Sequence, residues 1–474
     1  MVDLSPILGK HITFPLMCCF SYLLYKELLT IDKPQASVQN VKNKESSKGG
    51  DKWKPISLMD KEVEASSDAW DNTKPYPYKP FKAGEYKLNM GVKAIPISDW
   101  LVLENTYKQR IEAKWEIIRE NYDDVIYFLD PAMINQASGN SAESGDSALN
   151  QETLITEQDV ENCRRALCEL YDHVLGFLLK RFPQYFELLL SPSEESPGVL
   201  HNKIMGEFHP VDPRKYLELS KNDLEFVNYT CRDTDVIPAN VASTDAKRDH
   251  IGYRSLMSCT ETKRSHELIL SLARLVEEDL LLLLPNSSGQ FNEEYILMVG
   301  CFAFAAGFNP RERFLKPLTL VHGPVPEYKQ KLQTQMNRFF QTHKMGKLVM
   351  RLNFSFQTHT QMYVTDDNKG TDDEQISAKS LEDLRGGRDL FYRSERQCLI
   401  KLGPQSKAMC FSIKTYLWNM ADQFLTDEHY SKNGVLQDMY DAVAGMQENV
   451  GQYKRRPEWG PALLTLLQQK LQKA

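Results

Sequence analysis

Two apolar runs on either side of a Gly-Pro turn constrain the fold of this chain most. The runs cover 395–402 and 407–413, and Gly403-Pro404 lies between them. A short connection of this kind joins neighbouring strands of one hairpin, so we predict antiparallel pairing here. Strands are also predicted at 295–305 and 347–356. Helical patterns separate these runs without the regular alternation of a parallel sheet, which makes the predicted class α+β.

The run at 279–285 could finish the helix before it or form a buried strand, because periodicity does not separate the two. Helix caps are more informative. Ser98 is a plausible N-cap for one helix and Thr156 for another. The predicted helices cover 99–121, 157–181, 262–277, 326–342, 415–425, 436–447 and 459–473. The stretch 191–238 is predicted to be loop.

The length of 474 residues exceeds that of one typical domain, and low-complexity segments account for much of the excess. With 42% hydrophobic and 26% charged residues, the composition is that of a globular protein. We divide the chain into a hydrophobic N-terminal segment, a flexible linker, a main α+β domain with two insertions, and a helical C-terminal extension. Their bounds are 1–34, 35–75, 76–425 with insertions at 136–150 and 365–389, and 426–474.

Residues 11–25 carry no formal charge apart from the titratable His11. The stretch is short for a membrane span, which needs about 20 apolar residues. A membrane anchor and a hydrophobic helix docked on the protein both remain open. The linker that follows is rich in lysine, so an anchored chain would keep its globular part in the cytosol by the positive-inside rule. The predicted location is therefore membrane-associated with a cytosol-facing domain, or cytoplasmic.

Charge and motif content exclude several classes of partner and cofactor. The 57 Lys and Arg against 64 Asp and Glu give a net charge of −7, which makes nucleic acid a poor partner. None of the nine Cys falls in a C-x-x-C motif, and no phosphate-binding glycine loop occurs. The chain therefore shows no iron–sulfur or nucleotide site of its own.

Two segments place polar residues among apolar neighbours. In the first, His322 follows an apolar run and precedes the rigid turn Pro324-Val325-Pro326. Neutral imidazole is a common ligand of metal ions and haem iron, but a core histidine bonded to a carbonyl explains the pattern as well. In the second, alternation along a strand puts Glu395 on one face and Arg396 on the other. The arginine fork suits a carboxylate or haem propionate, or an ion pair within the sheet.

Several short motifs, in this order and spacing, resemble those of the haem-dependent oxidative N-demethylase family. The motifs are Asp99-Trp100-Leu101-Val102-Leu103, Glu278-Asp279-Leu280, His322-Gly323-Pro324-Val325-Pro326-x-Tyr328, Arg338-Phe339-Phe340, Asn353-Phe354-Ser355 and Glu395-Arg396-Gln397 through Thr415-Tyr416-Leu417. The resemblance runs from about 77 to 418 and points to a fungal-type member.

The resemblance implies a PAS-like antiparallel sheet that binds haem b. It implies an enzyme that uses O2, with electrons from a separate flavin and iron–sulfur reductase, to demethylate a small amine. By the same analogy His322 is the axial ligand, and Tyr328, Arg338 and Arg396 bind the cofactor. Glu395 and Arg396 are the catalytic candidates. The alternatives are a non-catalytic haem or small-ligand PAS-like sensor and a membrane-tethered interaction protein.

Overall fold

The computed structural model describes residues 63–75, 90–134, 153–194, 196–219, 260–289, 291 and 294–473. These residues belong to one compact unit, Trp53–Ala474. The hydrophobic segment 1–34 and the insertion 136–150 lie outside the described residues, so both stay predictions. Within the described part, none of the helices combines the length and the apolar character that a membrane span requires.

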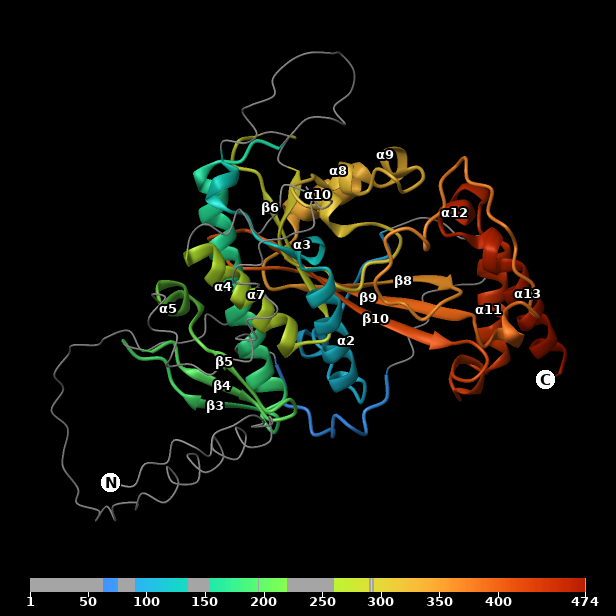
Figure 1. Cartoon of the computed structure of the whole chain (residues 1–474), viewed down its shortest axis with the longest axis horizontal. Coiled ribbons are helices and arrows are strands. Elements are labelled where there is room, and N and C mark those ends of the chain that lie inside the picture. Colours follow the sequence, from blue (N-terminus) through green and yellow to red (C-terminus); the bar gives the residue numbers. More distant parts are fainter. Residues whose placement is uncertain are drawn as a thin grey trace, which may run out of the picture. The chain divides into compact units, whose positions relative to one another are not determined.

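A seven-stranded antiparallel sheet forms the centre of the fold, in the order β1-β8-β9-β10-β6-β7-β2 (Figure 1). Its strands are β1 (Lys93–Ala94), β2 (Ile126–Tyr127), β6 (Asp279–Pro285), β7 (Tyr295–Cys301), β8 (Leu348–Gln357), β9 (Phe391–Lys401) and β10 (Met409–Asn419). The predicted α+β class, an antiparallel sheet flanked by helices, is confirmed. The PAS-like character of the sheet stays a prediction.

The β9–β10 hairpin pairs as the Gly-Pro turn predicts, with Cys410 opposite Ile400 at the turn end and Asn419 opposite Phe391 at the far end. The strand β10 is longer than predicted, and the helix predicted at 415–425 is wrong. Aromatic and β-branched side chains at 415–418 suit a strand, and pairing with β9 holds them extended. Within the stretch predicted as a helix, only the short helix η10 (Phe424–Thr426) forms.

A second, three-stranded sheet consists of β3 (Phe186–Leu190), β4 (Val199–Asn202) and β5 (Glu207–Pro210). The prediction of loop at 191–238 is confirmed for the described residues before Val199 but is wrong at β4, β5 and α5 (Pro213–Glu218), and 220–238 lie outside the described residues. These strands are short and bury polar side chains such as Asn202 and His209, so they lack the apolar alternation by which strands are recognised.

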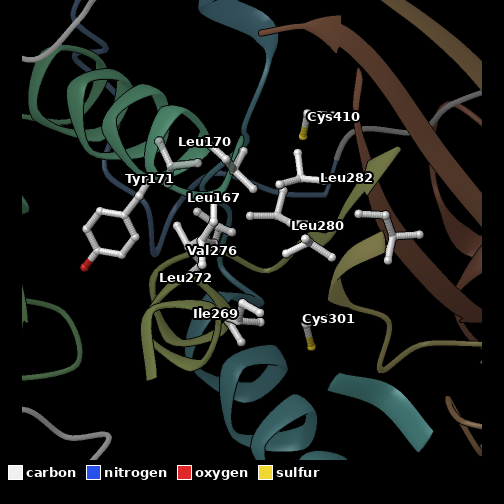
Figure 2. Packing of buried hydrophobic residues seen from close by; sticks show 14 of the residues in the cluster. Leu167, Leu170, Tyr171, Ile269, Leu272, Val276, Leu280, Leu282, Cys301 and Cys410 are labelled. Carbon is white, nitrogen blue, oxygen red and sulfur yellow. The ribbon is translucent and has the colours of Figure 1, made fainter. Parts of the chain in front are cut away.

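Helices α2 (Tyr107–Glu120), α4 (Glu157–Arg181) and α7 (Thr260–Leu275) lie on one side of the main sheet (Figure 1). Figure 2 shows the leucines and isoleucine of α4 and α7 directed at β6, namely Leu167, Leu170, Ile269 and Leu272 opposite Leu280 and Leu282. Cys301 and Cys410 are buried in the same core as free thiols. Thr156 caps α4 through a capping box with Asp159, as its position predicts. The run 279–285 is settled as the strand β6.

The predicted start of the helix at 99–121 is wrong, because α2 begins only at Tyr107. Ser98 instead accepts a hydrogen bond from the backbone N–H of Glu64. Trp100 is fully buried in the core ahead of the helix. The segment 97–106 thus packs as a largely irregular strap, and tertiary contacts override its helical spacing.

Two further helical groups complete the fold. The first consists of α8 (Leu318–Val321), α9 (Tyr328–Lys331) and α10 (Gln333–Thr342). The helices α9 and α10 replace the single helix predicted at 326–342, because the chain breaks at Leu332. The second lies beyond one end of β8–β10 and consists of α11 (Asn433–Ala444), α12 (Glu448–Tyr453) and α13 (Arg456–Gln472) (Figure 1). The short elements are η1 (Ile97–Asp99), α3 (Tyr122–Val125), η2 (Pro131–Met133), η8 (Pro310–Arg313) and η9 (Arg385–Gly387).

Candidate functional site

A cavity of about 290 Å³ lies against the sheet face opposite α4 and α7, and its empty space is about 1670 Å³ when the opening to solvent is included. Ligand sites commonly measure roughly 300–1,000 Å³, so the enclosed part alone stands near the lower end. Most of the lining is apolar, and the α8–α10 group and the strands β6 and β9 contribute to it. Examples are Leu281, Leu283, Leu332, Met336, Phe340 and Leu399.

His322 lines this cavity directly after α8, where it occupies the C-cap position. Its Nδ1 lies 2.9 Å from the carbonyl oxygen of Leu318, one helical turn earlier. A carbonyl only accepts, so Nδ1 carries the proton and Nε2 of the neutral ring is the acceptor. No described residue bonds Nε2. The ring of Tyr328 stacks on the imidazole with centroids 4.9 Å apart, which fixes the plane of the ring.

Burial lowers the pKa of His322 to about 4, and the nearby cations Arg351, Lys369 and Arg313 act in the same direction. The hydrogen bond to Leu318 opposes this shift but does not reverse it. The imidazole is therefore neutral at pH 7, which is the state in which a histidine nitrogen binds a metal. A donor bond from the other ring nitrogen to a carbonyl is also the usual support of a ligating histidine.

A buried carboxylate, Glu294, holds the helical wall around His322 together. Its oxygens accept from the backbone N–H of Thr319 at 3.0 Å and from Nδ2 of Asn337 at 2.6 Å. Thr319 lies in α8 and Asn337 in α10, so one side chain joins the first turn of α8 to α10. The His322 ring is thus positioned by a clamp that lies outside the cavity lining.

Four basic side chains line the cavity, namely Arg313, Arg351, Lys369 and Lys454. They come from η8, from β8, from the segment 365–389 and from the end of α12. Burial, with a contribution from Arg313, lowers the pKa of Lys369 to about 8, while Glu395 opposes the shift. The four basic residues give the cavity lining a clear excess of positive charge, which suits a ligand that carries carboxylates.

The segment 365–389, predicted as an acidic insertion, packs against the cavity wall. The backbone N–H of Gly370 donates to the carbonyl of Tyr453 at 3.1 Å, and that of Gly307 donates to the carbonyl of Val364 just before the segment, at 2.7 Å. A Cβ on Gly370 would lie 2.3 Å from the carbonyl oxygen of Gln452, so the approach of the two chains needs a glycine here. This packing brings Lys369 to the cavity.

Glu395 is the one acidic residue among the described lining residues. Its Oε2 accepts from Nε2 of Gln397 at 2.8 Å and from Nδ2 of Asn353 at 3.2 Å. The guanidinium of Arg393 approaches Oε1 at 3.6 Å. Two amides and one cation thus orient the carboxylate at the cavity surface, where it can pair with a cationic ligand group.

Arg396 lies on the other face of β9, as the alternation predicts. Its fork donates to the backbone carbonyls of Asp99 and Trp100, the first by a short contact and the second at 2.7 Å. The structure therefore does not bring Arg396 to the cavity, because its guanidinium ties the 97–106 strap to the sheet. Arg338 is exposed on α10 and also lies away from the cavity lining. Tyr328 is buried behind His322, and its hydroxyl contacts the sulfur of Met336.

The sequence prediction missed the four basic lining residues. They lie far apart in the chain and belong to elements of different kinds, so no local pattern joins them. Only Arg351 carries a usable signal, because it shares a face of β8 with Asn353 two residues later.

A family model described as haem-dependent oxidative N-demethylase, alpha subunit-like, matches residues 91–234 and 242–464. The match covers most of the chain. The chain belongs to this family. The matched region extends beyond residue 425, so it includes α12 and most of α13, which were predicted to be an extension. None of the curated proteins matches the chain.

The cavity fits the haem dependence that the family's name states. Haem would bring four nitrogen donors of its own, so the protein would need to add only one further donor, and the neutral tautomer of His322 leaves Nε2 as an acceptor for that purpose. The apolar walls suit the macrocycle, and the four basic residues suit its two propionates. No cluster of three or more His, Cys, Asp or Glu that could hold a metal ion occurs within the described ranges.

Proposed function

We propose that this member of the haem-dependent oxidative N-demethylase family binds haem b in the cavity beside His322 and removes a methyl group from a small amine. His322 Nε2 would be the iron ligand. Arg313, Arg351, Lys369 and Lys454 would neutralise the propionates. When bound, haem supplies the chemistry that activates O2 with electrons delivered by a separate flavin and iron–sulfur reductase, and the methyl group leaves as formaldehyde.

The chain's own residues would bind and orient the substrate. A small alkyl amine is a cation at pH 7, and Glu395 offers the carboxylate that pairs with it. Asn353 and Gln397 hold that carboxylate in place. Leu281 and Leu283 of β6 and the aromatic side chain of Phe411 line the same space and would exclude water from the methyl groups.

One observation carries the proposal most directly, namely the neutral ring of His322, which is fixed by Leu318 and Tyr328 and lines an apolar cavity. A core histidine that serves only packing would be expected to bond through both nitrogens or to lie away from a cavity. His322 does neither.

The test is an absorbance spectrum of the full-length protein expressed with ample haem, together with His322→Ala. We expect a Soret band that is shifted or lost in the variant, and formaldehyde release driven by NAD(P)H once a reductase is added. The control is His343→Ala, because His343 is also a partly buried histidine of the α10 region but lies outside the cavity lining. A protein that stays colourless on haem titration would contradict the proposal. Haem binding without product under any reductant would contradict the enzymatic part of the proposal and support a haem sensor.

A further inference from the structure

The turn after α10 presents an exposed methionine between exposed lysines. Met345 is 46% exposed, and Lys344 and Lys347 on either side of it are also exposed. The turn is held firmly, because Nε2 of His343 bonds the carbonyl of Lys347 at 2.7 Å and the backbone N–H of Gly346 donates to the carbonyl of Lys401 at 3.0 Å. The side chains are therefore displayed on a fixed backbone.

The β9–β10 turn adds a further cation to the same surface. Lys407 is exposed, and its charge acts on Lys401, whose backbone pairs with the 345–346 turn. We call Lys344, Met345, Lys347 and Lys407 the basic corner. Among the described residues, none of its three lysines takes part in an ion pair. The acid Glu169, which lies under the β9–β10 turn, is buried and accepts from Ser406.

The basic corner lies directly behind the cavity wall. The Nζ of Lys401 donates to the carbonyls of Phe340 and Gln341 at 2.9 and 3.0 Å, at the C-terminal end of α10. Phe340 lines the cavity, as does Leu399 two residues before Lys401 on β9. The surface and the cavity therefore share the end of α10 and the end of β9.

Three unpaired lysines on a chain of net charge −7 form a local positive surface that attracts an acidic partner. An exposed methionine at the centre favours a protein, because methionine is enriched in protein interfaces and has no matching partner on a phosphate backbone. We propose that the basic corner docks an acidic protein. Under the proposed function, on which this part rests, that protein is the electron donor.

The test measures binding of a plant-type [2Fe–2S] ferredoxin, an acidic electron carrier, to the full-length protein at low and at high salt. The variant combines Lys344→Glu, Lys347→Glu and Lys407→Glu. The matched control combines Lys432→Glu, Lys470→Glu and Lys473→Glu, which are exposed lysines outside the corner and change the net charge equally. We expect Kd to rise on the order of tenfold or more in the corner variant and to change little in the control.

Binding is measured without haem, so it does not depend on the proposed activity. If the protein is colourless but the corner variant still binds ferredoxin more weakly than the control, the docking surface is supported. In that case only the assignment of the partner as an electron donor is contradicted. Equal weakening in both variants, or no binding of ferredoxin at low salt, would overturn the proposal. So would a corner-specific loss of binding to phosphatidylserine vesicles without any loss of ferredoxin binding.

Discussion

At position 322 a single hydrogen bond decides which ring nitrogen is offered to the cavity. The carbonyl of Leu318 takes the Nδ1 proton, so Nε2 keeps its lone pair. The same residue is hard to protonate, because burial and neighbouring cations disfavour its charged form. Both effects act before any ligand binds, so the ring is already neutral, with Nε2 as its acceptor, in the free protein.

The first prediction concerns the titration of this ring. An NMR titration of the haem-free protein should place the pKa of His322 near 4, below the usual value of about 6.5. The unfolded chain then binds a proton between these pH values that the folded chain does not, so stability falls as pH falls from 6.5 to 4. Against a His322→Phe variant, the wild type should lose at most about 3 kcal/mol over this window. A pKa of 6 or above would contradict the buried neutral ring.

The second prediction concerns Glu395. The substitution Glu395→Gln removes the negative charge but keeps the size and the amide contacts, so folding and haem uptake should be retained. Loss of a charge-assisted bond of about 1.5–3 kcal/mol should raise the Kd for a small alkylammonium roughly 10- to 150-fold. Spectral titration with the amine measures this. The control is Glu382→Gln, an exposed acid outside the cavity, and an unchanged amine affinity in Glu395→Gln would exclude Glu395 from substrate binding.

At the scale of elements, the wall that carries His322 is a set of very short helices. An isolated helix of four residues such as α8 is not stable in water, because helix formation has a costly nucleus. Its position must therefore come from contacts, and the clamp of Glu294 on Thr319 and Asn337 supplies them. This carboxylate lies in the short link between β6 and β7, ahead of the helices that it holds together.

The third prediction follows from this clamp. The substitution Glu294→Gln should lower the free energy of unfolding by about 1–3 kcal/mol, the usual cost of disturbing a buried polar group. It should also shift the Soret band or weaken haem affinity, because His322 loses its fixed place. The control Glu327→Gln removes an i,i+4 pair with Lys331 at the surface and should cost at most about 0.5 kcal/mol. Normal haem affinity in Glu294→Gln would make the clamp purely structural.

Some elements of the fold could be predicted from the sequence, and others could not. The hairpin around Gly403-Pro404 and the capped helix at Thr156 follow from local turn and capping chemistry, and both were predictable. The helical patterns at 99–121 and 415–425 were misleading, the first of them only before Tyr107. Packing of Trp100 and pairing of β10 with β9 outweigh these local patterns. His322 and Glu395 were found from their apolar surroundings, whereas Lys369 needs the tertiary contact of Gly370 with α12 to become part of the site.

At the scale of the whole molecule, the cavity depends on the last helices of the chain. Nε1 of Trp459 in α13 donates to the carbonyl of Lys454 at 3.0 Å, and Lys454 in turn reaches the carbonyl of Phe354 on β8 at 2.6 Å. The end of α12 is thus part of the cavity wall, and α13 supports it.

The fourth prediction tests this dependence. Trp459 is 1% exposed, so Trp459→Ala should cost about 3–5 kcal/mol of unfolding free energy. Haem uptake should fall with it, because α12 loses its support. Denaturant unfolding followed by circular dichroism and a haem titration measure the two effects. Gln469→Ala, on the exposed face of the same helix, should change neither. Loss of stability with undiminished haem uptake would place the C-terminal helices outside the site.

The strand β9 carries two incompatible chemistries on consecutive residues. Glu395 faces the cavity, and Arg396 faces the strap at Asp99 and Trp100. Because the pleat alternates strictly, inserting or deleting one residue upstream within the strand would exchange the two faces. A buried guanidinium would then enter the cavity, and a carboxylate would meet two carbonyl oxygens. This strand should therefore accept many substitutions but no change of length, whereas a loop before it could grow or shrink freely during evolution.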